Sequence, residues 1–123
     1  MKRTYLIHVV TLSLILAACS QATPPADGIW TATSELGGFT FEVASGGTEI
    51  ILFEYEFSCQ RPGVATTQSS TVAFVTPIPI AEGGFQIDLL SEITVSGEFS
   101  PQGGSATGVL TFMSCSAEWQ ASP

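Results

Sequence analysis

Apolar and polar residues alternate with a period of two over much of the chain after residue 28. In the segment Phe39-Thr40-Phe41-Glu42-Val43, the three apolar side chains share one parity, and Thr40 and Glu42 share the other. Successive side chains of a β-strand point to opposite faces, whereas a helix repeats about every 3.6 residues. The segment is therefore predicted to be a strand with one face in the core.

Several later segments show the same alternation. The residues predicted to face inward are, segment by segment, Ile51, Phe53, Tyr55, Phe57 and Cys59, then Phe85, Ile87 and Leu89, then Cys115, Ala117 and Trp119. Residues 107–115 become apolar on both parities toward their end, which predicts one strand that is covered on both sides and ends at Cys115.

Glycine and proline interrupt these segments, and each interruption is typical of a turn because glycine tolerates a positive φ. The predicted turns are Gly37-Gly38, Gly46-Gly47, Arg61-Pro62-Gly63, Glu82-Gly83-Gly84 and Pro101-Gln102-Gly103-Gly104. No stretch of residues 28–121 shows helical spacing. The pattern predicts an all-β fold, an antiparallel sandwich or small barrel of about seven or eight strands.

One segment is predicted to lie at the edge of the sheet. Residues from Gln68 to Val75 are rich in Ser and Thr, which suits a solvated edge strand. Pro77 and Pro79 follow, and because proline has no N–H to donate, this stretch is restricted to an edge or a crossing loop.

Some apolar residues fall on the parity opposite to the predicted core. They are Ile50, Leu52, Val72, Phe74, Leu110 and Phe112. If a second sheet covers them they belong to the core, and if not, they form an exposed apolar patch that fits a partner.

The N-terminus has a different pattern. Met1-Lys2-Arg3 is positively charged, and the mainly apolar run from Leu6 to Leu16 is too short to span a bilayer comfortably. A charged start, a short apolar stretch and small residues after it are typical of a secretory signal peptide, here predicted at residues 1–18 as a helix.

The sequence Leu16-Ala17-Ala18-Cys19 resembles the lipobox of bacterial lipoproteins. The resemblance implies that the thiol of Cys19 receives a diacylglyceryl group such as a palmitate-bearing one, and that the signal peptide is cut before it. The protein would then sit on the cell membrane or outer membrane, facing away from the cytoplasm. The alternative is an ordinary signal peptide followed by a chance cysteine.

Two cysteines remain once Cys19 is assigned to lipid. Because exported compartments favour oxidation, Cys59 and Cys115 are predicted to form a disulfide. Closing a loop of this length stabilises the fold by roughly 4 kcal/mol in the chain-entropy model. A pair of free thiols is the alternative.

Residues 19–27, which include Pro24 and Pro25, are predicted to be a lipidated tether that does not pack, and residues 28–121 to be the β domain. Beyond residue 18, one positive charge, on Arg61, against eleven negative charges leaves −10. Such a surface cannot neutralise a phosphate backbone, so nucleic-acid binding is excluded, and anionic lipid headgroups repel it.

The same part of the chain contains no Lys and no His. This composition argues against a histidine-assisted nucleophile and against a histidine metal site, so no catalytic residue, metal or cofactor is assigned. Glu54 and Glu56 lie on one strand face and are the candidates for a carboxylate-based hydrolase, although a solvated face explains them equally. Calcium is the other alternative, with carboxylates near turns at Glu35, Glu49 and Glu82 as first candidates.

The body is also loosely similar to small β domains of exported bacterial proteins. The shared positions are Gly28-Ile29-Trp30, Phe41-Glu42-Val43, Cys59 with Cys115, and Trp119-Gln120-Ala121. The resemblance implies a sandwich-like fold and does not imply any particular activity. The overall expectation is a lipid-anchored, non-enzymatic binding or structural module of the cell envelope, whose partner, a protein or a glycan, the sequence does not identify. A calcium-dependent adhesion domain and a small hydrolase remain the alternatives.

Overall fold

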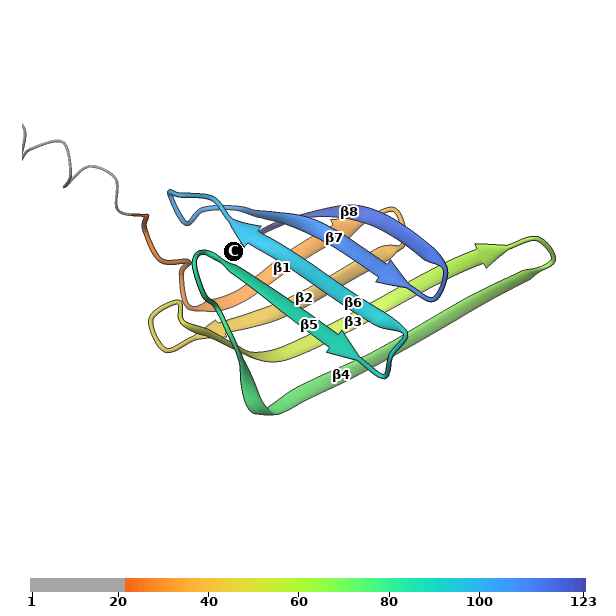
Figure 1. The fold of residues 1–123 in the computed structure, drawn as a ribbon, viewed down its shortest axis with the longest axis horizontal. Helices are drawn as coiled ribbons and strands as arrows, with labels where there is room; N and C mark the ends of the chain where they lie inside the picture. Colours follow the sequence, from red (N-terminus) through yellow and green to blue (C-terminus); the bar gives the residue numbers. More distant parts are fainter. Residues whose placement is uncertain (1–21) are drawn as a thin grey trace, which may run out of the picture.

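Eight antiparallel strands form most of residues 22–123, the part of the chain that the computed structural model describes (Figure 1). They are β1 (Gly28–Ser34), β2 (Gly37–Ala44), β3 (Glu49–Arg61), β4 (Val64–Pro79), β5 (Gly84–Leu89), β6 (Ile93–Phe99), β7 (Ala106–Phe112) and β8 (Cys115–Ser122). The prediction of an all-β antiparallel fold is confirmed. Within these residues there is no helix with the length and apolarity needed to cross a membrane.

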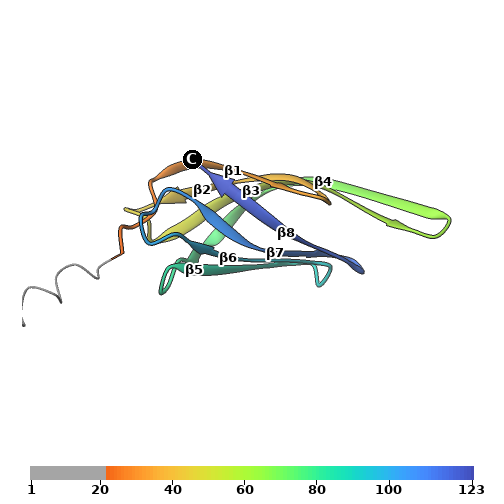
Figure 2. The ribbon, with the colours of Figure 1, turned by 90° about the horizontal axis from the view of Figure 1, so that it is seen from above.

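The strands form one barrel-like sheet in the order β4-β3-β2-β1-β8-β7-β6-β5. Each half of the chain is a four-stranded meander, and β1 pairs with β8 from Thr31↔Ser122 to Ser34↔Trp119 to join the halves. Figure 2 shows β3 and β4 on one side, β5 and β6 on the other, and β7 and β8 between them. β4 and β5 do not pair, so the barrel is closed by β1 and β8 and left open between its two edge strands.

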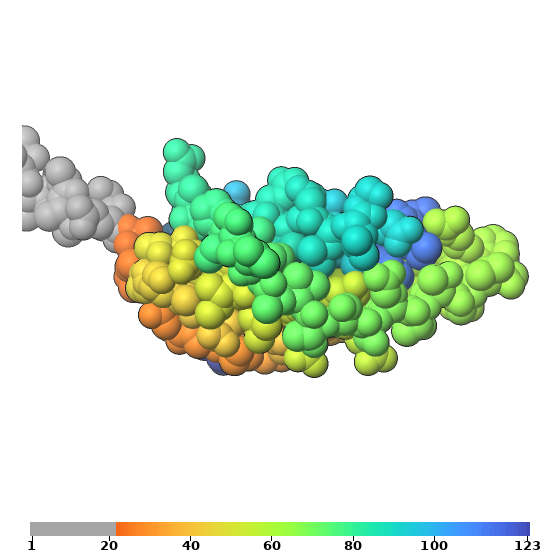
Figure 3. All heavy atoms as spheres, turned by 90° about the horizontal axis from the view of Figure 1, so that it is seen from below, coloured from red at the N-terminus to blue at the C-terminus, as the bar shows by residue number. Residues whose placement is uncertain are grey.

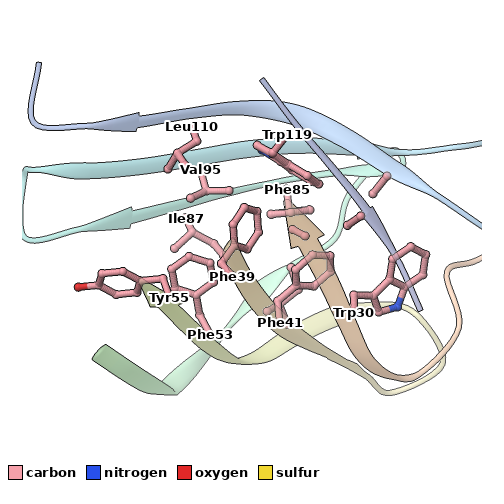
Figure 4. Close-up of a cluster of buried hydrophobic side chains, with 14 of the residues drawn as sticks. Trp30, Phe39, Phe41, Phe53, Tyr55, Phe85, Ile87, Val95, Leu110 and Trp119 are labelled. Carbon is pink, nitrogen blue, oxygen red and sulfur yellow. The ribbon is translucent and has the colours of Figure 1, made fainter. Parts of the chain in front are cut away.

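Aromatic side chains from both halves fill the space enclosed by the sheet (Figure 4). The ring of Phe39 lies 5.2 Å from that of Trp119 and 5.4 Å from that of Phe53 between centroids, with the edge-to-face and tilted geometries that such rings prefer. Of the alternating residues predicted to face inward, most are fully buried: Phe39, Phe41, Val43, Phe53, Tyr55, Phe57, Cys59, Phe85, Ile87 and Trp119. No charged or polar residue among 22–123 is buried, so the core is held together by apolar contact.

One predicted inward residue is misassigned. Ile51 is only half-buried, and its neighbour Ile50 is fully buried instead. Both ladders of β3 shift between Ile50 and Leu52, so Ile51 is the extra residue of a β-bulge. A bulge reverses the parity of the strand on one side of it, which strict alternation cannot anticipate.

The predicted strand over residues 107–115 is in fact the end of one strand and the start of the next. β7 ends at Phe112, and Cys115 begins β8 directly opposite it. Met113 has a φ of 54°, in the left-handed region, and turns the chain between them. The sequence has no glycine or proline here, so the usual signal of a turn is missing.

The predicted disulfide is confirmed. The Cα atoms of Cys59 and Cys115 are 5.6 Å apart, a normal distance for the bond. β3 and β8 are not neighbours in the sheet. The bond therefore crosses the inside of the barrel and ties the two halves together.

Two close approaches set the position of Trp119. Its indole Nε1 donates a hydrogen bond to the Ser96 carbonyl over 3.1 Å, and its ring covers the backbone of Gly97. A Cβ placed on Gly97 would lie 2.4 Å from the Trp119 ring and 3.0 Å from the Phe85 ring. Gly97 is thus required because no side chain fits under the indole.

We therefore expect Gly97→Ala to lower the free energy of unfolding by about 1–3 kcal/mol, the usual cost of overpacking a filled core. Chemical denaturation of the purified protein measures the change. Gly104→Ala is the matched control, since a Cβ there meets no atom within 4 Å. Equal stability of the two variants would contradict this account of the core.

Candidate functional site

The two ends of the barrel differ in what they carry. One end holds the entering chain and the turns between β2 and β3, β4 and β5, and β6 and β7; we call it the tether end. The other holds the remaining turns and the tip of the β3–β4 hairpin, Pro62-Gly63; we call it the distal end. Figure 1 shows the entering chain (orange) and the hairpin tip (yellow-green) at opposite extremes of the long axis.

Residues Thr23–Asp27 pack against the tether end, so the prediction that the tether does not pack is wrong for them. The Thr23 N–H donates to the Pro101 carbonyl over 2.8 Å, and Pro25 is buried. The Asp27 carboxylate accepts hydrogen bonds from the backbone N–H groups of Gly46 and Gly47. These bonds anchor the chain before the first strand begins.

The β2–β3 turn is shaped to receive this segment. Gly46 and Gly47 both have positive φ, 73° and 83°. A Cβ on Gly47 would lie 2.6 Å from the Pro25 carbonyl oxygen. Glycine thus supplies both the backbone conformation and the room for the entering chain, and the two backbone N–H groups meet the charge of Asp27.

At the distal end, the β3–β4 hairpin extends beyond its neighbours. β2 pairs with β3 only as far as Phe57, whereas β3 continues to Arg61 paired with β4 alone. Cys59 lies in this extension and is bonded to Cys115 at the start of β8. The disulfide therefore holds the base of the hairpin against the other half of the barrel.

The outer edge of β4 is free. Among residues 22–123, β3 is the sole strand that pairs with it. None of its sixteen residues is charged, and all of them are half-buried or exposed. The other edge strand, β5, has six residues and bears Asp88. The prediction of an edge strand around Gln68–Val75 is confirmed, and it is longer than predicted.

Glu54 and Glu56 lie on the outer face of β3, opposite Thr71 and Ser69 of β4. Both side chains are exposed. They border a shallow groove of about 380 Å³ on the outside of β1, β2 and β3, whose other polar residues include Thr31, Thr33 and Thr40. The pair lies on the open face expected from the alternation, where solvent surrounds both carboxylates.

The three candidate calcium ligands are not brought together. Glu35 lies in the β1–β2 turn at the distal end, whereas Glu49 and Glu82 belong to the tether end. The Glu49 carboxylate accepts a hydrogen bond from the Ser45 hydroxyl over 2.8 Å. In the described part of the chain, no three acidic, Cys or His residues are close enough to hold a metal ion.

The apolar residues that fall on the parity opposite to the predicted core are expected to be either covered core residues or an exposed patch. The structure divides them between full and partial burial. Ile50, Leu110 and Phe112 are fully buried and belong to the core. Leu52, Val72 and Phe74 are half-buried. These three half-buried residues lie on β3 and β4, near the opening of the barrel.

A larger open groove, of about 1020 Å³, lies on the outside of β1, β7 and β8. Thr33, Thr107, Val109, Glu118 and Gln120 are among its lining residues. The sequence contains no local signal for it, because β1 and β8 come from opposite ends of the chain and meet only through the ladder that joins the halves.

Cys19, the predicted lipid attachment site, lies outside the described residues. No protein-family model matches the chain. No curated protein and no solved structure matches it either.

We expect replacement of both disulfide cysteines, Cys59→Ser with Cys115→Ser, to lower the free energy of unfolding by about 2–5 kcal/mol, the usual cost of removing a native disulfide from a small domain. Amide hydrogen exchange should quicken most at the base of the hairpin, around Ser58 and Thr67. Ser116→Ala, an exposed position in β8, serves as control. Unchanged exchange at the hairpin would contradict the bracing role of the bond.

Proposed function

We propose that this protein is a lipid-anchored, non-enzymatic binding module of the bacterial cell envelope, held by Cys19 and facing away from the cytoplasm. The observation that carries the proposal is the opposition of the two ends of the barrel. The chain enters and docks at the tether end, and the β3–β4 hairpin projects from the distal end (Figure 1).

The docked segment makes the anchor short. Thr23 is fixed to the barrel through its bond to Pro101, and it comes four positions after Cys19 in the chain. An extended chain spans at most about 3.6 Å per residue, so a lipidated Cys19 lies within about 14 Å of the tether end. The hairpin is then the part of the molecule farthest from the lipid.

Charge keeps the body of the protein off the bilayer. The part beyond residue 18 carries −10, and anionic headgroups repel such a surface within about a Debye length. Acidic residues lie at both ends, with Asp27, Glu49 and Glu82 at the tether end, so this repulsion does not choose between orientations. The direction of the module follows from the short anchor, which favours presenting the distal end outward.

A binding role suits the residues that are presented. The hairpin and the β4 edge offer backbone groups and small hydroxyl side chains, which suit recognition through hydrogen bonds. The absence of Lys and His beyond residue 18 and the exposed placement of Glu54 and Glu56 favour binding over catalysis.

We expect Cys19→Ser to abolish incorporation of a labelled fatty acid in the native host and to move the protein from the membrane to the soluble fraction. A lipid-linked thiol is needed because the rest of the acidic chain gains nothing at the bilayer. The double variant Cys59→Ser with Cys115→Ser is the control and should stay labelled. Equal membrane retention of Cys19→Ser would refute the anchor.

Photo-crosslinking in intact cells tests the orientation. A photoreactive residue at Val64, 61% exposed beside the hairpin tip, should give discrete protein adducts. The same residue at Gln102, exposed in the β6–β7 turn, should give adducts to lipid. Lipid adducts from Val64 together with protein adducts from Gln102 would reverse the proposed orientation.

A further inference from the structure

We infer that the free edge of β4 is a docking site for an extended polypeptide segment in which cationic and apolar side chains alternate. The segment would add to the sheet as a ninth strand next to β4. This inference rests on the proposed binding function and specifies the side-chain chemistry of the partner. Three features of the edge carry it: the backbone, the outer face and the inner face.

The backbone of β4 is available for pairing. In the region Val64–Ala73 the only ladder partner within residues 22–123 is β3, and no other backbone hydrogen bond reaches these residues. Figure 2 shows β4 and β5 far apart along most of β4. Figure 3 shows the spheres of β4 (green) at the surface, from the corner with β5 toward the hairpin tip. The unpaired groups of this edge thus face solvent.

The edge lacks the usual protection against strand addition. Exposed edges are normally short, or carry Lys, Pro or an inward-pointing charge. β5 follows this rule with six residues and Asp88. β4 has no charge, and its prolines, Pro77 and Pro79, come only after Ala73, where its regular pairing with β3 is interrupted. An uncharged run of β-prone residues remains open over more than half of the strand.

The outer face beside this edge is acidic. Glu54 and Glu56 of β3 are exposed and pair with Thr71 and Ser69 of β4, whose side chains are small. An added strand lies about 4.8 Å beyond β4, and its outward side chains start about 10 Å from those of the two glutamates. A Lys or Arg at these positions reaches over the small hydroxyl residues to a carboxylate. Every second residue of the partner is therefore expected to be cationic.

The inner face beside this edge becomes apolar toward Ala73. Thr66, Gln68 and Ser70 face inward opposite Cys59, Phe57 and Tyr55, whereas Val72 faces inward opposite Phe53 and stays half-buried. Phe74 is likewise only partly buried and packs against the core where the barrel is open. Apolar side chains on the inner face of an added strand would cover Val72 and Phe74, so the inward-facing partner residues at this end are expected to be apolar.

A second copy of this chain fits the edge less well. Its own β4 has no cation to set opposite Glu54 and Glu56. Antiparallel pairing of two β4 strands would also direct the two tether ends in opposite directions, which does not suit two chains anchored in one membrane. Parallel pairing would place the acidic bodies of both copies side by side without any compensating charge.

The test uses a synthetic peptide of alternating lysine and valine, about eight residues long and blocked at both ends. The probe is titrated into the full-length protein in detergent. Binding should weaken with added salt, and amide hydrogen exchange should slow in β4 and not in β5. A peptide of the same composition with its lysines and valines in separate blocks is the control for net charge, and it should bind at least tenfold more weakly.

Three double variants locate the site. Glu54→Gln with Glu56→Gln should weaken binding about fivefold, as expected for two exposed ion pairs. Glu98→Gln with Glu118→Gln removes the same charge from exposed positions on β6 and β8 and should leave binding within twofold of the original. Ser69→Lys with Thr71→Lys should abolish binding while leaving the melting temperature unchanged, because both side chains are exposed.

Four results would overturn the inference: no binding of the alternating peptide, equal binding of both peptides, equal effects of the two glutamine pairs, or protection outside β4. A concentration-dependent dimer that Ser69→Lys with Thr71→Lys abolishes would assign the edge to a second copy instead. If crosslinks from Val64 persist while the peptide fails to bind, only this inference falls. If those crosslinks are absent as well, the proposed function falls with it.

Discussion

The fold depends on the ladder between β1 and β8. Within each half of the chain the strands form a meander, and the aromatic face of each meander would be exposed if that half stood alone. Four residue pairs between the first and last strands join the two halves. They bring Trp119 onto Phe39 and Phe41, so that each half covers the apolar face of the other. The disulfide then fastens the distal end of the assembled barrel.

This closure also decides where the sheet ends. Joining the halves at β1 and β8 leaves β4 and β5 as edges, and β4 leaves its regular pairing with β3 at the irregular stretch Phe74–Pro77, opposite Ile51, before it leads to β5. The long hairpin, the free edge and the partly covered apolar residues therefore lie together as a result of strand order. The acidic residues of β3 lie beside them because alternation directs Glu54 and Glu56 outward. Strand order and alternation together therefore give the β4 edge an outer face and an inner face of different chemistry.

Much of the fold could be predicted because its signals are local. Alternation in residues such as Phe39 to Val43 assigned faces correctly, and Gly46-Gly47 marked a turn. The failures have physical causes. A bulge at Ile51 leaves no compositional trace, Met113 turns the chain without glycine, and Thr23–Asp27 dock through backbone bonds and one carboxylate that no spacing rule describes. For the candidate site, the edge strand and the outward glutamates were predictable, but their position beside the opening between β4 and β5 was not.

The sequence by itself determined the class of fold, the faces of most strands and the pairing of Cys59 with Cys115. The fold class and the strand faces follow from the period-two alternation, and the disulfide follows from the number of cysteines. Only the tertiary structure decided which strands become edges, which end receives the tether and which end bears the hairpin. Those outcomes depend on which of eight similar β-prone segments pair over long distances. The contacts of Trp119 with Phe39 and Phe41 accompany the pairing that joins the halves, and no local pattern encodes them.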